Sequence, residues 1–329
     1  MRSSSRNPAR RIRLAAAGLS LLALTACGGG GGDAFEAASE GASGTSSAPT
    51  QEVVVGAQGF TEAAIMQQMY VLLLQDAGFT TSTKTAERPI LTESLKSGEV
   101  DVVPDYLGST LNFVYNSVNS DNTEPVSTND PQQNVAKFKE VGEPLGITAL
   151  EPAQASDQNA FYVTKEFADA NGGLTTLSEL AALKQKLTLG ADTFCGADTQ
   201  PYCINGLKGT YGLDLTLEDS YQFGSPKLRD DVLKGVVDIG ETGTTDGTME
   251  PNGLVILQDD KKLQPAENLT PFINTKEAGD PKIAEALNKL APVLTTEDLT
   301  GLNAKVDAER QKPEDVAKVY LVSKSLIKG

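Results

Sequence analysis

The sequence predicts an α/β fold made of two similar lobes, and three observations support this prediction. Short apolar strands alternate with helical periodicity from residue 52 onward, which is the pattern of a parallel α/β sheet. The segments 95–110 ("LKSGEVDVVPDYLGST") and 233–246 ("LKGVVDIGETGTTD") share an order: a helix end, a Val-Asp strand, an acidic residue, then glycine with hydroxyl residues. About 280 residues follow residue 50, enough for one large domain or two medium ones.

Strand and helix alternate through the first half of this region. The expected elements are the strand 52–56, the helix 61–77, a short strand, the helix 89–97, the strand 100–103, a helix through Lys137 and a strand near 147–152. Thr61 is the expected N-cap of the first helix, and Glu62 suits the positive end of its dipole. Residues 117–131 are polar and rich in turn formers, so we expect a surface insertion there.

The second half repeats the alternation. The expected elements are the strand 160–164, a helix from residue 176, the strand 186–192, a helix that ends near residue 211, the strand 220–224, the helix 226–234, a strand from residue 236, the strand 254–260 and a mostly helical C-terminus. Thr176 and Glu179 have the spacing of a capping box. Pro281 and Pro313 stand where helices open, because proline is tolerated in the first helical turn.

Residues 1–27 have the order of a bacterial lipoprotein signal peptide. Five arginines flank or precede a short apolar stretch at 14–23, and "LTAC" (24–27) matches a lipobox. Cys27 would then carry lipid and become the new N-terminus; an ordinary secretory signal with a chance cysteine is the alternative. Residues 28–50 are rich in glycine, serine and alanine, so we expect a flexible tether. The mature chain would be extracytoplasmic and lipid-anchored, at the outer face of the cytoplasmic membrane or in the periplasm.

Charge and cysteine content limit the partners and the compartment. Loss of the five arginines in the signal segment takes the formal charge from −16 to −21, which disfavours nucleic acid as a partner. Cys195 and Cys203 are the cysteines that remain, and they bracket "CGADTQPYC". An even pair in an extracytoplasmic chain predicts a disulfide that closes a small loop. A metal site would need further ligands, and no histidine or other cysteine is there to supply them.

The absence of histidine excludes several kinds of site. Ser-His-Asp and Cys-His hydrolases, His-ligated zinc and histidine proton shuttles all require one. Two alternatives remain open: a hydrolase that uses paired carboxylates such as Asp105 and Glu241, and a lipoprotein that holds Ca²⁺ in its acidic loops, although no stretch has EF-hand spacing. We expect a protein that is not an enzyme, with no cofactor and no metal.

The polar loops that follow the two Val-Asp strands are the candidate ligand site. Ligands of open α/β sheets bind beyond the carboxyl ends of the strands. Two lobes could therefore present these loops to each other across a cleft. The alternative is that both loops are solvated connections between a strand and a helix.

The chain resembles the substrate-binding lipoproteins of osmoprotectant (glycine betaine, choline, carnitine) ABC transporters over nearly all of residues 52–325. Six segments carry the resemblance in the same order: "VVVGAQGFTEAAIMQQMYVLLLQDAGF" (53–79), "DVVPDYLGST" (101–110), "LEPAQASDQNAFYVTKEFADANGGLTTLSELA" (150–181), "VVDIGETGTTDGTM" (236–249), "LVILQDDKKLQPAENLTPFINTKE" (254–277) and "LNKLAPVLTTEDLTGLNAKVDAERQKPEDVAKVYL" (287–321).

The resemblance implies a two-lobed, periplasmic-binding-protein-like fold of type II, a venus flytrap in which the chain crosses between the lobes twice. With crossings placed near 153–157 and 247–252, lobe I is 51–154 plus 250–329 and lobe II is 155–249. Such a protein closes on a small zwitterionic or polar solute and delivers it unchanged to a membrane permease driven by a cytoplasmic ATPase. We expect a monomer.

The resemblance also implies ligand contacts. In the family a cage of tyrosines holds the quaternary ammonium group; Tyr106 matches a cage wall, and Gln58 and Ser109 match contacts to the ligand carboxylate. Where further tyrosines are common, this chain has Asn159 or Phe161, the run Gly243-Thr244-Thr245-Asp246, and Asn303-Ala304. A ligand other than simple glycine betaine is therefore expected. The full set of expected contacts is Gln58, Phe60, Thr61, Tyr106, Ser109, Thr110, Asp157, Gln158, Asn159, Glu241, Thr242, Thr244, Thr245 and Asp246.

Overall fold

The structure is a computed structural model, and it describes residues 51–119, 121, 124–197 and 200–329. The signal segment with Cys27 and the tether 28–50 lie outside these residues, so both stay predictions. Within the described ranges, no helix combines the length and the apolar character that crossing a membrane requires.

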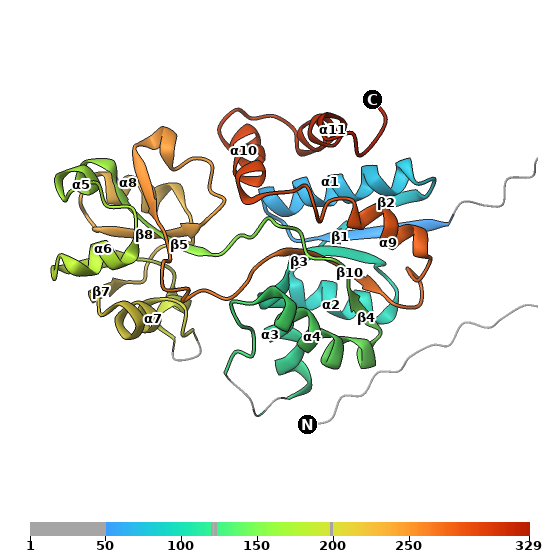
Figure 1. The fold of residues 1–329 in the computed structure, drawn as a ribbon, viewed down its shortest axis with the longest axis horizontal. Helices are drawn as coiled ribbons and strands as arrows, with labels where there is room; N and C mark the ends of the chain where they lie inside the picture. The colour runs from blue at the N-terminus through green and yellow to red at the C-terminus, as the bar shows by residue number, and fades with distance from the viewer. Residues whose placement is uncertain (1–50, 120, 122–123, 198–199) are drawn as a thin grey trace, which may run out of the picture. The chain divides into compact units, whose positions relative to one another are not determined.

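The described chain forms two lobes, each built on a five-stranded sheet flanked by helices (Figure 1). Lobe I contains β1 (Glu52–Ala57), β2 (Thr80–Thr85), β3 (Val102–Tyr106), β4 (Ile147–Ala149), β10 (Leu269–Asn274), α1 (Thr61–Asp76), α2 (Arg88–Ser97), α3 (Leu107–Val118), α4 (Pro131–Gly142), α9 (Pro281–Asn288), α10 (Thr296–Asp307) and α11 (Pro313–Ser323). Lobe II contains β5 (Asn159–Thr164), β6 (Lys186–Gly190), β7 (Asp214–Glu218), β8 (Ile239–Gly243), β9 (Leu254–Leu257), α5 (Lys165–Ala170), α6 (Leu177–Ala182), α7 (Ile204–Gly206) and α8 (Pro226–Leu233).

The two sheets have the same topology. Their strand orders are β2-β1-β3-β10-β4 and β7-β6-β8-β5-β9, so β3 and β8 are the two central strands. The similar segments 95–110 and 233–246 contain these strands, which explains the similarity as one structural unit used twice. Both sheets are mixed, because β10 runs antiparallel to β3 and β4, and β5 runs antiparallel to β8 and β9. The expectation of parallel sheets is therefore wrong for β5 and β10, the first strand that each lobe receives after a crossing.

The chain passes between the sheets twice (Figure 1). Residues 150–158 join β4 to β5, and residues 258–268 join β9 to β10. The sequence placed the return to lobe I at 247–252. The structure places it later, because β9 follows that segment and pairs with β5 along its full length, which keeps it in the second sheet.

The two passages form a short two-stranded hinge. Ser156 and Asn268 make an antiparallel bridge between them. Beside this bridge the backbone N–H of Asp157 donates to the carbonyl of Glu267 at 3.1 Å. The side chains of Asp157 and Glu267 are consequently attached to the segment about which the lobes would move.

Helices cover both faces of the first sheet, and each face has its own apolar core. In Figure 1, α1, α9, α10 and α11 lie on one side of this sheet and α2, α3 and α4 on the other. Met66, Met69 and Tyr70 of α1 are fully buried in the first of these cores. The capping box of Thr176 and Glu179 is also present, at the start of α6.

Several local expectations are wrong. Thr61 is the first residue of α1 rather than its cap, because Phe60 holds the cap position and Thr61 Oγ1 donates to Asp307 at 2.7 Å. Residues 220–224 form turns, and the strand that pairs with β6 is the earlier β7. The sequence did not predict α3 and β10.

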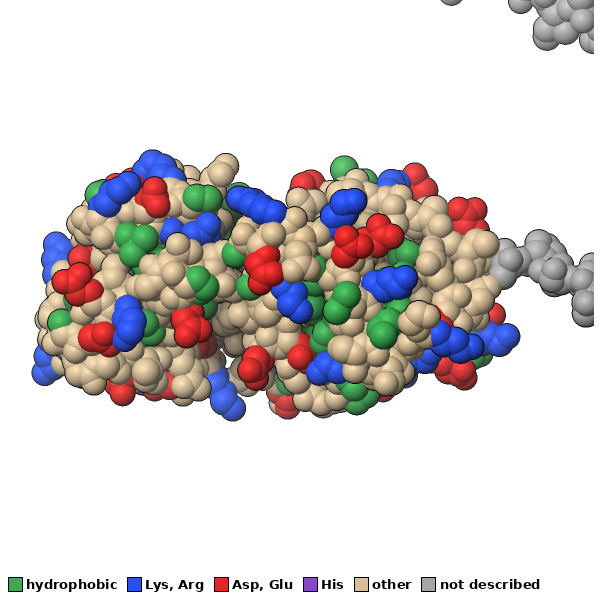
Figure 2. Space-filling view, turned by 90° about the horizontal axis from the view of Figure 1, so that it is seen from above, with side chains coloured by type: hydrophobic (Ala, Val, Ile, Leu, Met, Phe, Trp, Pro, Cys, Tyr) green, Lys and Arg blue, Asp and Glu red, His purple; other side chains and the backbone are tan. Residues whose placement is uncertain are grey.

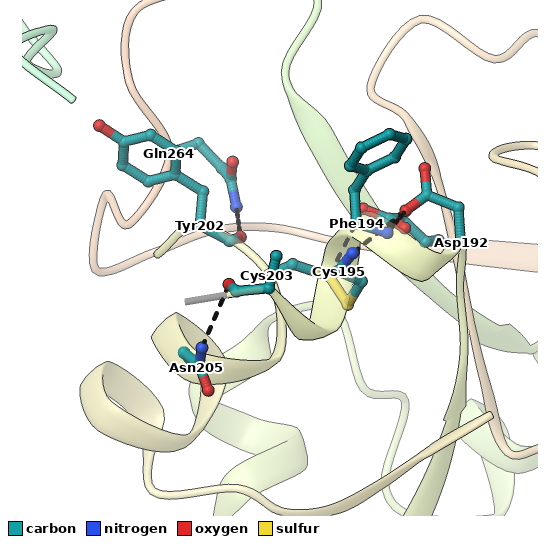
Figure 3. Close-up of a disulfide and its surroundings, with 9 residues drawn as sticks. Asp192, Phe194, Cys195, Tyr202, Cys203, Asn205 and Gln264 are labelled. Atoms are coloured by element: carbon teal, nitrogen blue, oxygen red, sulfur yellow. Dashed lines mark hydrogen bonds between the residues drawn. A yellow bond between two sulfur atoms is a disulfide. The ribbon is translucent and has the colours of Figure 1, made fainter. Parts of the chain in front are cut away.

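The segment around Cys195 and Cys203 forms one wall of lobe II. The two Sγ atoms lie 1.94 Å apart, and both residues are buried. Each cysteine directly follows an aromatic residue, and Figure 3 shows the rings of Phe194 and Tyr202 on either side of the disulfide. The Gln264 side chain donates to the carbonyl of Tyr202 at 2.7 Å, which ties this wall to the second passage of the hinge.

Replacing both cysteines with serine is expected to lower the free energy of unfolding by about 2–3 kcal/mol, because the bond closes a short loop in the unfolded chain. Urea denaturation of the double variant measures this loss. The unaltered protein in excess reductant serves as the matched comparison and is expected to lose the same amount. Equal stability of the oxidised protein and the variant would contradict a structural role for the bond.

Candidate ligand site

A cleft of about 1400 Å³ lies between the lobes. Twelve of the fourteen expected contact residues line it: Gln58, Phe60, Thr61, Tyr106, Ser109, Asp157, Gln158, Asn159, Glu241, Thr242, Thr245 and Asp246. Thr110 and Thr244 do not. Thr110 is buried within α3, and Thr244 steadies the hinge, since its Oγ1 accepts from the backbone N–H of Gln158 at 3.0 Å. The cleft therefore gathers the first turn of α3, which directly follows β3, and the loop after β8, as the shared topology of the two sheets requires.

Glu62, in the first turn of α1, joins the two lobes at the cleft. Its carboxylate accepts hydrogen bonds from Tyr106 Oη at 2.7 Å, from Thr245 Oγ1 at 2.6 Å and from Asn303 Nδ2 at 2.6 Å. Thr245 follows β8 in lobe II, whereas the other two donors belong to lobe I. All three donors are neutral. Burial raises the pKa of Glu62, and the nearby charge of Asp307 raises it further.

Asp157, on the first passage of the hinge, is a second carboxylate held by neutral donors. Its Oδ1 accepts from the backbone N–H of Thr245 at 3.1 Å and from Thr244 Oγ1 at 3.2 Å. Gly243 makes this approach possible, because a Cβ at that position would lie 2.7 Å from Asp157 Oδ1. Burial raises the pKa of Asp157 to about 7, and the charge of Glu62 is the second cause, so the two carboxyls repel each other when both are ionised.

Glu267, on the second passage, binds Ser109, the residue that was expected to contact the ligand carboxylate. Its carboxylate accepts from the backbone N–H of Ser109 at 2.9 Å and from Ser109 Oγ at 2.8 Å. Gly108 leaves the space for it, since a Cβ there would lie 3.1 Å from Glu267 Oε1. Burial raises the pKa of Glu267 to about 7. Ser109 lines the cleft as expected, but its donors already serve a carboxylate of the protein.

Gln58, the other expected carboxylate contact, is engaged in the same way. Its side-chain amide donates to Asp105 Oδ1 at 3.2 Å. Arg88 also binds Asp105, with Nε at 2.9 Å from Oδ2 and Nη2 at 2.8 Å from Oδ1. This bidentate pair neutralises Asp105 and leaves it unsuited to act as one of two free carboxylates in a hydrolase.

Asp246 and its partners form the lobe II rim of the cleft. The Asp246 carboxylate accepts from Thr242 Oγ1 at 2.7 Å and from Thr248 Oγ1 at 2.6 Å. Arg229 Nη1 lies 3.4 Å from the same carboxylate and donates to the carbonyl of Gly224 at 2.9 Å. Asp246 thus stabilises its own turn, where its Oδ1 also accepts from the backbone N–H of Thr248 at 2.9 Å, and it also lines the cleft.

Glu241, on β8, lies beside the disulfide and lines the cleft. It is 3% exposed, and its Oε1 is 3.5 Å from Cys203 Sγ. Burial raises its pKa to about 8 and the charge of Asp192 adds to the shift, whereas a hydrogen bond from the Asp192 backbone to this carboxylate lowers the pKa. One atom each of Cys195, Cys203 and Glu241 lie within 4.8 Å of one another, but the two sulfurs are bonded to each other and offer no thiolate to a metal.

Aromatic faces line both sides of the cleft. Phe60 and Tyr106 of lobe I are stacked, with ring centroids 6.3 Å apart and an angle of 11° between their planes. Phe194, Tyr202 and Phe223 line it from lobe II. These three were not expected as contacts, and the positions where the family commonly has tyrosine remain non-aromatic or buried. The sequence feature that could have identified Phe194 and Tyr202 is their position directly before Cys195 and Cys203.

The sequence analysis also missed several polar residues of the cleft. Glu62, Arg88, Arg229, Glu267 and Asn303 all line it. Four of them stand in helices, where charged and polar residues also suit a solvent-exposed face, so the sequence offers no local sign of a site. Asn303 was singled out only as half of an unusual Asn-Ala pair. What the arrangement offers chemically is a two-sided aromatic cleft with an excess of carboxylates.

Comparison with known proteins agrees with this architecture. The family described as the substrate binding domain of ABC-type glycine betaine transport system matches residues 51–323. A glycine-betaine-binding protein of Pseudomonas aeruginosa is 26% identical over 284 residues, which cover 83% of this chain and 88% of the relative. The glycine betaine-binding protein YehZ of Escherichia coli is 26% identical over 287 residues, covering 84% and 92%.

The fold has solved counterparts. The crystal structure of a glycine betaine/carnitine/choline ABC transporter component superposes with a TM-score of 0.70 at 22% identity and covers 84% of this chain and 100% of that one. The family match, which extends over both lobes and the hinge, decides the assignment. This chain belongs to the family of substrate-binding domains of ABC-type glycine betaine transport systems.

Proposed function

We propose that this protein captures a small quaternary-ammonium or related polar solute of the osmoprotectant class in its cleft and passes it unchanged to the permease of an ABC importer. The observation that carries the proposal is the cleft itself: aromatic faces from both lobes stand beside buried carboxylates at a hinge. Aromatic faces attract quaternary ammonium ions, and the carboxylates add an attractive charge. Membership of a family of ABC-type transport proteins supports the delivery of the solute to an ABC importer.

The same proposal places the protein outside the cytoplasm. Lipidation at Cys27 would anchor it to the membrane, and the tether 28–50 would give it reach toward a permease and its cytoplasmic ATPase. A bond between Cys195 and Cys203 suits an oxidising compartment. We propose a monomer with lobe I formed by 51–154 and by the chain after β9, and with no enzymatic step, cofactor or metal.

Calorimetry with glycine betaine, choline, carnitine and proline, together with solution scattering, tests the proposed function. At least one of these solutes is expected to bind and to reduce the radius of gyration as the lobes close about the hinge. Failure of all four to bind or to compact the protein would refute capture of this class of solute.

Removal of an aromatic face is expected to weaken binding of a quaternary ammonium ligand. Phe60→Ala and Tyr106→Ala should each cost about 1–2 kcal/mol of binding free energy, or roughly 5- to 30-fold in Kd. Tyr106→Phe keeps the ring and loses only the bond to Glu62, so it should retain most of the affinity. Calorimetry measures each value.

Tyr115→Ala is the matched control for these variants. Tyr115 lies in α3 beside Lys137, whose Nζ is 5.6 Å from the ring centroid, and it is not among the lining residues. The control should bind as the unaltered protein does. Unchanged affinity in both Phe60→Ala and Tyr106→Ala would show that the stacked pair does not touch the ligand.

The free energy of unfolding of the ligand-free protein is expected to fall between about pH 5 and pH 8. The pKa values of Asp157 and Glu267 are raised to about 7 and that of Glu241 to about 8, whereas carboxyls of the unfolded chain titrate near pH 4. The folded protein therefore holds protons that the unfolded chain has released. The stability that this provides is complete below about pH 4 and is lost as the pH rises through 7 to 8.

Urea denaturation at a series of pH values measures this dependence. Carboxylates with lowered pKa, such as Asp231 and Asp298, act in the opposite sense, but their effect is confined to pH values below about 4. Glu241→Gln, whose amide does not titrate, should remove the upper part of the slope. A stability that rises from pH 5 to pH 8 would contradict the assignment.

A further inference from the structure

We infer that the ligand is a quaternary ammonium cation that carries a hydroxyl group, and that Glu241 accepts the hydrogen bond of this hydroxyl. The inference rests on the proposed function and narrows it: an amino alcohol of the choline type is preferred over the zwitterion glycine betaine. Glu241 would then be the residue that sets the specificity of the cleft.

The first observation is an unpartnered carboxylate oxygen in the cleft wall. Glu241 lines the cleft and is 97% buried, yet across the described residues its Oε2 has no hydrogen-bond partner. Its Oε1 faces Cys203 Sγ at 3.5 Å, and a disulfide sulfur has no hydrogen to donate. A buried acceptor without a donor is costly. The cost is removed when a ligand brings the donor.

A second unpartnered acceptor points the same way. Asn303 lies in the lobe I wall, and its Nδ2 donates to Glu62 at 2.6 Å and to the carbonyl of Thr245 at 3.1 Å. These bonds fix which end of the amide is the nitrogen. The remaining atom, Oδ1, is buried and has no partner in the described part of the chain. Both unsatisfied oxygens therefore require donors: Asn303 Oδ1 in every state of the protein, and Glu241 Oε2 whenever its carboxyl is ionised.

Two of the three arginines that line the cleft are bound to the protein's own groups. Arg88 forms the bidentate pair with Asp105, and Arg229 is bound to Gly224 and Asp246. The third, Arg310, is exposed. Against these three arginines, eight of the described lining residues are aspartate or glutamate. A ligand carboxylate would meet negative charge and occupied donors, including those of Ser109, whose N–H and Oγ already serve Glu267.

Ligand chemistry decides between the candidates. Glycine betaine has a trimethylammonium group and a carboxylate, and therefore no hydrogen-bond donor. It would leave Glu241 Oε2 unsatisfied and add a second anion to the cleft. A quaternary amino alcohol keeps the cation for the aromatic faces, lacks the carboxylate and supplies one donor. Sites built to hydrogen-bond a particular polar group discriminate strongly against analogues without it.

Calorimetry on the full chain with three probes at about pH 8 tests the inference. Choline and tetramethylammonium share the cationic group and differ in the hydroxyl; choline and glycine betaine differ in hydroxyl against carboxylate. Choline is expected to bind about 10- to 150-fold more tightly than either, which is the range for one buried hydrogen bond to a charged group.

The variant Glu241→Gln keeps the shape of the side chain and removes its charge. It is expected to weaken choline and to bring the ratio of choline to tetramethylammonium affinities to within about threefold. Glu166→Gln removes the same charge from an exposed position of α5, outside the cleft, and should leave that ratio unchanged. If Glu241→Gln does not fold, the three probes on the unaltered protein still decide.

The outcomes separate the inference from the proposed function. Glycine betaine binding as tightly as choline, or an unchanged ratio in Glu241→Gln, overturns the inference and leaves solute capture standing. Glycine betaine that binds more tightly at pH 6 than at pH 8 overturns it too, because a protonated Glu241 would then be donating to the ligand carboxylate. If none of the probes binds, both the inference and the capture of quaternary ammonium solutes fail.

Discussion

Carboxylates that are buried without a hydrogen-bonded cation are the constraint on which the cleft depends. Glu62, Asp157 and Glu267 meet where the lobes join, and each is held by neutral hydroxyl, amide or backbone donors. Such donors satisfy the oxygens but leave the negative charge in place, so the group remains costly to ionise. These carboxylates, which are unfavourable to ionise, lie at the hinge. On the surface, by contrast, Figure 2 shows acidic and basic side chains interspersed. A cation between the lobes is the natural complement.

The shared topology of the lobes explains how these groups come together. At the end of each central strand a glycine leaves space for a carboxylate from a hinge passage: Gly108, in the first turn of α3 directly after β3, for Glu267, and Gly243, the last residue of β8, for Asp157. The same arrangement, a glycine at the end of a central strand next to a hinge carboxylate, thus occurs once in each lobe. A movement of the hinge would alter both carboxylate positions at once, which couples the charge of the cleft to the angle between the lobes.

Much of the fold was predictable because it depends on neighbours in the sequence. Strand-helix alternation, the capping box and the loops beyond β3 and β8 all leave local patterns. The direction of β5 and β10 does not, since it follows from the crossings and not from residue type. The site was half predictable for the same reason. Glu62 was recognised as a helix-dipole residue, but its role depends on Asn303, which is 241 positions away in the sequence. Ser109 and Gln58 are residue types suited to a ligand carboxylate, but they donate hydrogen bonds to Glu267 and Asp105 of the protein itself.

The pairing of Cys195 with Cys203 affects the stage at which the protein becomes able to bind its solute. Phe194 and Tyr202 are each covalently adjacent to one sulfur of the bond, so the rigidity of the lobe II wall follows the thiol redox state of the surroundings. In a reducing cytosol these rings would be positioned by the backbone, by the Gln264 contact to the Tyr202 carbonyl and by the hydrogen bond from Tyr202 Oη to the carbonyl of Ser127. Oxidation after export would complete the receptor, so that maturation and solute capture occur on the same side of the membrane.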